Sequence, residues 1–175
     1  LMGLAGSGKS TQGKILAERL SGVWLSAGQV LRDTQDASVS AVQREGGLVT
    51  DKVTIPLMTK EMAQAIVDGK EVILDGFPRT KEQAEWAAEN IADRVKVMIQ
   101  IVVSKKELIR RLEVRGREDD QSREAIEERF RIVEENMLMV ERAMGAAGVK
   151  TTRVSGEGTP EEVAERIWQV VKKVI

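Results

Sequence analysis

The chain has 175 residues, 42% of them hydrophobic, which is enough for one sizeable core and short for two full domains. Its 27 basic and 28 acidic side chains leave a formal net charge of −1, so nothing draws the whole molecule to nucleic acid or to an acidic membrane. The absence of cysteine and histidine excludes disulfides, thiolate metal sites, Ser-His-Asp triads and most zinc sites.

The sequence also disfavours a membrane-spanning protein and a secreted protein. No apolar run approaches the ~20 residues of a transmembrane helix, and no signal-peptide pattern is visible. We therefore expect a cytoplasmic protein with no membrane and no nucleic-acid partner, and we take a monomer as the default. A bound metal would be a hard cation held by oxygens, which indicates Mg²⁺ and no zinc.

Residues 3–10 match the phosphate-binding pattern G-x-x-x-x-G-K-[ST] at every fixed position, and Thr11 follows. Glycines let the backbone turn so that its N–H groups face phosphate oxygens, and the helix that follows adds its dipole. In this pattern Lys9 reaches the outer phosphates, and the hydroxyl of Ser10 or Thr11 ligates Mg²⁺. A strand has to precede such a loop, so we expect the chain to begin inside that strand. The alternative is an ordinary Gly/Ser turn.

The first part of the chain reads as helices around one short strand. Apolar spacing predicts helices and a strand in this order: a helix over 10–20, a strand over 23–25, a helix after Ser26 and a helix over 37–44. A longer helix begins near Thr50 and ends before Gly69, and Pro56 is expected to kink it or to restart it.

The second part alternates strands with helices. A strand over 71–74 precedes a helix over about 81–90, and the β-branched run 95–103 is typical of a strand buried on both faces. Ser104 and Glu107 have the spacing of a capping box at the start of the next helix. The remaining elements are a polar loop over 116–121, a helix from 122 to about 144, a strand over 149–154 and a final helix.

The N-terminus of that final helix carries its own signals. Thr159 is the predicted N-cap, Pro160 occupies the first helical position, and Glu162 completes a capping box. Alternating strands and helices predict an α/β fold, with a doubly wound parallel sheet and helices on both faces. Ligands of such sheets bind beyond the carboxyl ends of the strands, where the segments 3–8 and 75–79 both lie.

Four segments together resemble adenylate kinase and its sister nucleoside monophosphate (NMP) kinases. They are, in order, residues 3–11, 25–32, 74–80 and 111–120. The third reads Leu-Asp-Gly-Phe-Pro-Arg-Thr and is specific to that family group. The resemblance covers nearly the whole chain. It implies reversible, Mg²⁺-dependent phosphoryl transfer from ATP to AMP, giving two ADP.

The resemblance also implies an architecture. The fold would be of the P-loop NTPase type, with a five-stranded parallel sheet, a small helical NMP-binding insertion and a lid in its short form. The whole chain, residues 1–175, would be one kinase domain. Its parts would be a core of 1–25, 70–115 and 122–175, an NMP-binding region of about 26–55 and a lid of about 116–121.

The ATP half of the implied site uses the phosphate loop and two later segments. Arg111 would stack on the adenine of ATP, and Gly158 would approach it through its backbone. The position of Asp75 at the end of a buried strand suits a carboxylate that binds Mg²⁺ through water, beside Ser10. The predicted ATP-binding residues are Gly6, Ser7, Gly8, Lys9, Ser10, Thr11, Arg111, Arg115 and Gly158.

The AMP half draws on the second and third segments. Arg32 and Arg79 would hold the α-phosphate, Gln83 would read the adenine edge, and the Phe77–Pro78 bond would be cis. The predicted AMP-binding residues are Ala27, Arg32, Gly47, Leu48, Val49, Gly76, Phe77, Pro78, Arg79, Gln83, Arg117 and Arg129.

Catalysis in such a site needs no strong base, because the attacking phosphate oxygen is already ionised. Positive groups align the phosphates and neutralise their charge. The predicted catalytic residues are Lys9, Arg79, Arg115, Arg117 and Arg129. Arg129 lies one residue further past Asp119–Asp120 than is usual in the family, so Arg123 is the alternative for its role.

The sequence indicates the nucleotide that accepts the phosphoryl group less clearly than it indicates the donor ATP. Gln83 favours AMP, but Ala27 stands where adenylate kinases usually have threonine, and Gln29 replaces an acidic residue. We predict AMP as the main acceptor, with UMP or CMP as additional acceptors, and a UMP/CMP kinase as the alternative. A non-catalytic P-loop nucleotide-binding module is the alternative of another class. The pair Arg32 and Arg79 disfavours it, because a switch needs no second phosphate clamp.

Overall fold

The computed structural model describes residues 1–34, 50–115 and 122–175. Several predicted features lie outside the described residues, namely the helix over 37–44, the AMP-site residues Gly47, Leu48 and Val49, the lid over 116–121 and its Arg117.

The strands form two parallel pairs. Strand β1 (Val23–Ser26) pairs with β2 (Val72–Asp75), and β3 (Met98–Val102) pairs with β4 (Thr151–Ser155). All four overlap the predicted strands, and their ends differ from the predicted ends by at most three residues. The α/β class and the parallel pairing are therefore confirmed.

The segment in front of the phosphate loop lies between these pairs. Met2 N–H donates to Ile99 O at 2.8 Å, and Ile101 N–H donates to Met2 O at 2.9 Å. On the other side, Gly76 N–H donates to Leu1 O at 3.3 Å. Met2 forms an isolated parallel bridge, so among the described residues the sheet appears as two linked pairs and not as five continuous strands.

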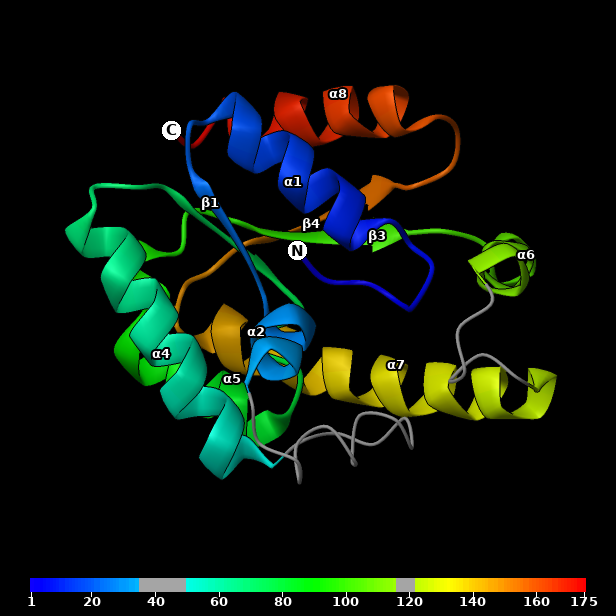
Figure 1. Cartoon of the computed structure of the whole chain (residues 1–175), viewed down its shortest axis with the longest axis horizontal. Coiled ribbons are helices and arrows are strands. Elements are labelled where there is room, and N and C mark those ends of the chain that lie inside the picture. The colour runs from blue at the N-terminus through cyan, green and yellow to red at the C-terminus, as the bar shows by residue number, and fades with distance from the viewer. Residues whose placement is uncertain (35–49, 116–121) are drawn as a thin grey trace.

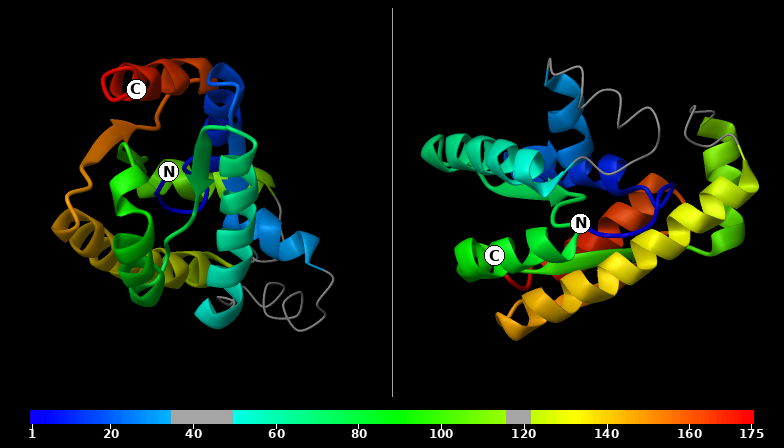
Figure 2. Two further views of the ribbon diagram at one scale, coloured as in Figure 1. Left: turned by 90° about the vertical axis from the view of Figure 1, so that its left-hand side faces the viewer. Right: turned by 90° about the horizontal axis from the view of Figure 1, so that it is seen from below.

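Helices cover both faces of the strands. Helices α1 (Lys9–Arg19) and α8 (Pro160–Val171) lie on one face, and α5 (Lys81–Asn90) and α7 (Arg123–Ala146) lie on the other (Figure 1). The view from below in Figure 2 shows α7, in yellow, running diagonally across its face. This confirms the predicted doubly wound arrangement.

Shorter and peripheral elements complete the chain. They are α2 (Ala27–Asp33), α4 (Asp51–Val67), the 3-10 helix η1 (Ala92–Arg94) and α6 (Lys105–Arg115). Helix α4 continues through Pro56, so no restart occurs there. The capping box of α8 forms as predicted, with Thr159 and Glu162 exchanging hydrogen bonds. None of the helices in the described ranges is long and apolar enough to cross a membrane.

The main hydrophobic core lies between the strands and the helices α1, α6, α7 and α8. Its fully buried members include Ile101 of β3, Leu112 of α6 and Phe130 of α7. Met144 of α7 is also buried, as its helical spacing predicted, in a second cluster beneath α5. The core thus fixes the ends of β2, β3 and β4 relative to α1.

Helix α1 approaches β1 closely at Gly13. A Cβ atom on Gly13 would lie 2.6 Å from the indole Nε1 of Trp24. The ring cannot move away freely, because its N–H donates to Asp75 Oδ2 at 3.3 Å and Lys14 Nζ lies 4.8 Å from its centroid. Position 13 therefore has room for hydrogen only.

We expect Gly13→Ala to lower the free energy of unfolding by about 1–3 kcal/mol, because the methyl group overpacks against Trp24. The matched control is Gly145→Ala in α7, where nothing lies within 4 Å of an added Cβ. That change should raise stability by roughly 0.5–1 kcal/mol through the higher helix propensity of alanine. Urea unfolding followed by circular dichroism measures both, and equal effects would contradict the close approach.

Candidate functional site

The loop that precedes α1 turns around the ammonium group of Lys9. Gly3, Gly6 and Gly8 all have positive φ, and Gly8 is the N-cap of α1. Lys9 Nζ donates to Gly3 O at 2.8 Å and to Leu4 O at 2.9 Å, which closes the loop on itself. This is the backbone course of a phosphate cradle at a helix N-terminus.

The remaining loop residues keep the predicted order around that turn. Ser7 is buried, and its backbone N–H donates to Leu4 O at 3.2 Å. Ser10 and Thr11 lie exposed in the first turn of α1. Both predicted hydroxyl ligands of Mg²⁺ thus belong to the helical turn that directly follows the loop.

Asp75 connects the loop to the end of β2. Its side chain is buried at 1% exposure, and Ser10 Oγ donates to Asp75 Oδ2 at 2.7 Å. The indole N–H of Trp24 donates to the same oxygen. A carboxylate beside a hydroxyl is an all-oxygen set, which suits a hard cation that takes its other ligands from water and phosphate. The two predicted Mg²⁺ residues are therefore adjacent.

In the turn after Asp75, the side chain of Arg79 lies against the backbone of Gly76. Gly76 has a φ of 70°, and a Cβ there would lie 2.6 Å from Nε of Arg79. The Phe77–Pro78 bond is cis, as the resemblance implied. Phe77 is buried and packs edge-on against Trp86 of α5, with ring centroids 5.9 Å apart. The turn is thus anchored on its apolar side while Arg79 is exposed on the other.

Arg79 and Arg32 come together from separate elements. The pKa of Arg79 is lowered, chiefly because neighbouring protein atoms displace part of the hydration of its guanidinium. The Asp75 carboxylate opposes this, and the positive charge of Arg32 adds to it. Arg32, on α2, is itself exposed and donates from Nη2 to Gln29 Oε1 at 2.9 Å. Positive charge from two segments thus acts at Arg79, which suits the binding of an anion there.

Gln83 is buried, at 4% exposure, within a small polar network. Arg79 N–H donates to Gln83 Oε1 at 2.8 Å, and Gln83 Nε2 donates to Asp51 Oδ1 at 2.6 Å. Thr80, the N-cap of α5, donates its hydroxyl to Asp51 Oδ2 at 2.9 Å and accepts the N–H of Gln83. Sequence reasoning did not single out Asp51 for this site, because its partner lies 32 positions away.

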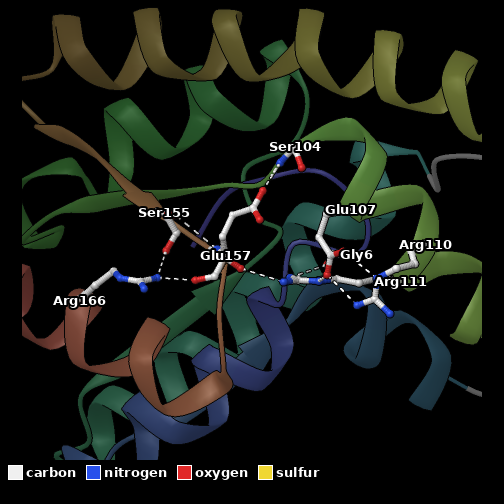
Figure 3. Close-up of polar contacts among 9 residues, drawn as sticks. Gly6, Ser104, Glu107, Arg110, Arg111, Ser155, Glu157 and Arg166 are labelled. Carbon is white, nitrogen blue, oxygen red and sulfur yellow. Dashed lines mark hydrogen bonds and ion pairs between the residues drawn. The ribbon is translucent and has the colours of Figure 1, made fainter.

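Arg111 joins three segments on the other side of the loop (Figure 3). Its Nε donates to Glu107 Oε1 at 2.7 Å, its Nη2 donates to Gly156 O at 3.1 Å, and its Nη1 lies 3.5 Å from Gly6 O. Gly158 follows in the same loop with a φ of 101°. The structure thus joins Arg111 to the phosphate loop at Gly6 and to the later loop at Gly156, two residues before Gly158.

The prediction of a capping box between Ser104 and Glu107 is wrong. Ser104 N–H donates to Glu157 Oε1 at 3.0 Å, and the carboxylate of Glu107 instead pairs with Arg110 and Arg111. Hydrogen bonds from Arg110 and then Arg111 lower the pKa of Glu107 to about 2. The backbone N–H of Ser104 is the main cause that lowers the pKa of Glu157. The two carboxylates thereby support the Arg111 side of the site.

The loop after β4 is held from its far side as well. Arg166 of α8 donates from Nη1 to Ser155 O at 3.0 Å and to Glu157 O at 2.6 Å (Figure 3). Arg111 and Arg166 therefore bind three consecutive carbonyl groups of the same segment, those of Ser155, Gly156 and Glu157. Neither Arg166 nor Glu157 carried a motif by which the sequence could have identified it.

The remaining predicted arginines that the structure describes lie along helices α6 and α7. Arg115 ends α6, and Arg129 is half-buried on α7. Arg123, the alternative to Arg129, is exposed on the same helix and pairs with Glu127 at 3.0 Å. Ala27, at the start of α2, is buried at 2% exposure.

Comparisons with known proteins give a consistent result. A family model described as adenylate kinase matches residues 1–144. The adenylate kinase of Thermus thermophilus is 34% identical over 179 residues, which covers 95% of this chain and 92% of that protein. Those of Micrococcus luteus and Thermobifida fusca are 32% and 31% identical. Their alignments cover 99% and 98% of this chain, and 90% and 96% of the respective relatives.

We expect Glu107→Gln to raise the KM for ATP about two- to fivefold, because Arg111 loses its carboxylate partner in a partly exposed pair. Glu128→Gln is the matched control, since Glu128 pairs with Arg131 of α7 at 2.7 Å, with the i,i+3 spacing that Glu107 has to its other partner Arg110. It should leave that KM unchanged. Steady-state kinetics at varied ATP separate the two variants, and equal KM values in both would contradict a role for Glu107.

The same pair predicts a pH dependence of stability. The folded pKa of Glu107, about 2, lies below its ordinary value of 4.5. The stabilisation is therefore fully present above about pH 4.5 and is lost as the pH falls towards 2. Wild type and Glu107→Gln should differ in melting temperature at pH 7 and converge on acidification. A difference that grows at low pH would contradict the ion pair.

Proposed function

Because the chain belongs to the adenylate kinase family, we propose that it transfers a phosphoryl group reversibly from ATP to AMP and yields two ADP. Phosphoryl transfer between nucleotides follows from family membership. The position of Asp75 is the observation that supports a site for two nucleotides. Its carboxylate accepts from Ser10 of the phosphate loop and also acts electrostatically on Arg79. The phosphate loop and the turn that carries Arg79 thus meet at one buried carboxylate.

The ATP half of the site is the phosphate loop with the Arg111 side. Backbone N–H groups over Gly6 to Thr11 and the ammonium of Lys9 would hold the phosphates. Lys9 would exchange its bonds to Gly3 O and Leu4 O for phosphate oxygens. Arg111 and the backbone of Gly158 would contact the adenine.

The AMP half lies on the opposite side of Asp75. Arg32 and Arg79 would hold the α-phosphate, which relieves the repulsion between two guanidinium groups. Gln83 would read the base. The other contacts would come from Ala27, Gly76, Phe77, Pro78, Gly47, Leu48 and Val49.

Ser10 and Asp75 would hold Mg²⁺, directly or through water at Ser10 and through water at Asp75. Their fit rests on the 2.7 Å hydrogen bond that already joins these two oxygens. When bound, Mg²⁺ supplies charge neutralisation and orientation of the phosphates of ATP.

The transfer itself needs alignment more than proton chemistry. An oxygen of the AMP phosphate forms a bond to the γ-phosphorus, and the bond from that phosphorus to the β–γ bridging oxygen breaks, which releases ADP. The crowded negative charge would be met by Lys9, Arg79, Arg115, Arg117 and Arg129. Positioned cations of this kind act mainly on the transition state.

The arrangement of the chain during turnover is part of the same proposal. Residues 1–175 would act as one kinase domain, in which the NMP-binding region over 26–55 and the lid over 116–121 close on the core. Closure would exclude water and so suppress hydrolysis of ATP. We also propose a cytoplasmic monomer with neither nucleic acid nor membrane as partner.

A second acceptor class has one observation in its favour. Ala27 offers no hydroxyl at a buried position where adenylate kinases usually have threonine. We therefore propose UMP or CMP as additional acceptors. A coupled assay across AMP, CMP, UMP and GMP tests this, and negligible pyrimidine turnover would overturn it. Poor AMP turnover beside good pyrimidine turnover would favour a UMP/CMP kinase.

We expect Arg79→Gln to lower kcat/KM for AMP by at least about 100-fold, because one of two phosphate-holding cations is lost. Binding of ATP alone should persist, since Arg79 lies in the AMP half. Arg153→Gln is the matched control, because Arg153 is an exposed arginine paired with Glu141 at 3.0 Å. A coupled assay and calorimetry measure both, and wild-type binding of ATP without formation of ADP from ATP and AMP would overturn the proposed function.

A further inference from the structure

We propose that Asp51 fixes which way round the side-chain amide of Gln83 points, and that it thereby selects acceptor bases with an amino group over bases with an oxo group. The inference rests on the proposed function, because it takes Gln83 as the group that meets the acceptor base. Asp51 is then a positioning residue, which acts through Gln83.

The two partners of the amide have opposite and unambiguous chemistry. A backbone N–H can only donate, and it is the Arg79 N–H that meets Gln83 Oε1 at 2.8 Å. An ionised carboxylate can only accept, and it is Asp51 Oδ1 that meets Gln83 Nε2 at 2.6 Å. A flipped amide would set its oxygen against the carboxylate and its NH₂ against the N–H. Both bonds would become repulsive contacts, so only one orientation is stable.

The carboxylate that does this is itself held in place. Thr80 donates its hydroxyl to Asp51 Oδ2 and accepts the backbone N–H of Gln83, which closes a ring of three hydrogen bonds. Asp51 is also the first residue of α4, where a negative charge is favoured by the helix dipole. Gln83 is 4% exposed, and burial makes such directional bonds stronger.

The fixed amide retains one N–H and one carbonyl lone pair for a ligand. A 6-aminopurine offers an amino donor beside the N1 acceptor, which complements this pair. A 6-oxopurine offers an oxygen acceptor beside an N1–H donor, so both contacts are mismatched. Cytosine and uracil differ in the same sense at their 4-position. Asp51 therefore favours AMP over IMP and GMP, and CMP over UMP.

A purely structural role for Asp51 makes a different prediction. The bonds from Thr80 and Gln83 also tie α4 to α5, so loss of the carboxylate could lower stability alone. In that case the relative use of amino and oxo bases would stay constant. The ratio of two acceptors measured on the same protein sample separates the two roles, because the folded fraction cancels.

The decisive comparison uses AMP and IMP, which differ only at the 6-substituent and the N1 proton. Asp51→Asn gives position 51 an amide that can donate as well as accept. This removes one of the two contacts that hold the Gln83 amide, while the Arg79 N–H still favours the original orientation. We expect the AMP:IMP ratio of kcat/KM to fall about three- to tenfold, with the KM for ATP unchanged. Equilibrium titration with AMP and IMP without ATP should show the same loss of preference.

Two further variants complete the design. Asp68→Asn is the matched control, because Asp68 follows the same helix α4 and accepts from Gln64 Nε2 at 3.0 Å on the exposed surface. It should retain the wild-type ratio. Asp51→Glu keeps an acceptor-only group, so it should retain a larger preference for AMP than Asp51→Asn does. It also serves as the test if Asp51→Asn does not fold.

The outcomes distinguish this inference from the proposed function. A wild-type protein that does not phosphorylate AMP overturns the proposed function. A wild-type protein that prefers AMP, with an Asp51→Asn ratio equal to that of Asp68→Asn, overturns the role of Asp51 and leaves the function standing. Titration of the wild-type chain with CMP and UMP needs no variant, and binding of UMP as tight as that of CMP would also overturn the inference.

Discussion

The arrangement of the site depends on the hydrogen bond between Ser10 and the buried carboxylate of Asp75. It ties the first turn of α1 to the end of β2, and the indole N–H of Trp24 binds the same oxygen from β1. A buried carboxylate is costly unless such donors surround it. Gly13 leaves the space that the indole needs. The hydrogen bond from Trp24 to Asp75 therefore depends on the close packing of α1 against β1.

Electrostatic repulsion shapes the acceptor side of Asp75. The positive charge of Arg32 adds to the desolvation that lowers the pKa of Arg79, and the carboxylate of Asp75 offsets this only in part. A bound phosphate would supply the missing negative charge. On the donor side, Lys9 satisfies its ammonium with the carbonyls of its own loop, which phosphate oxygens can replace. Both groups of positive charge are thus suited to bind anions.

Local sequence patterns predicted the helices, strands and turns well. They could not predict contacts between residues that lie far apart in the chain. The phosphate loop, the Asp75–Arg79 turn and the capping box at Thr159 each carry their signal within a few residues. The bond from Asp51 to Gln83 spans 32 positions and that from Ser104 to Glu157 spans 53, so no pattern could show them. The Ser104–Glu107 spacing was misleading, because two arginines compete for Glu107 more strongly than a helix N-terminus does.

The central claim is that two nucleotides meet across Asp75, and a bisubstrate analogue with two adenosines joined by five phosphates tests it most directly. A crystal structure of that complex should show one analogue per chain. One adenine should lie beside Arg111 and Gly158, the other at Gln83, and Lys9 and Arg79 should both contact the phosphate chain. An analogue bound through only one adenosine, with Arg79 away from every phosphate, would contradict the claim.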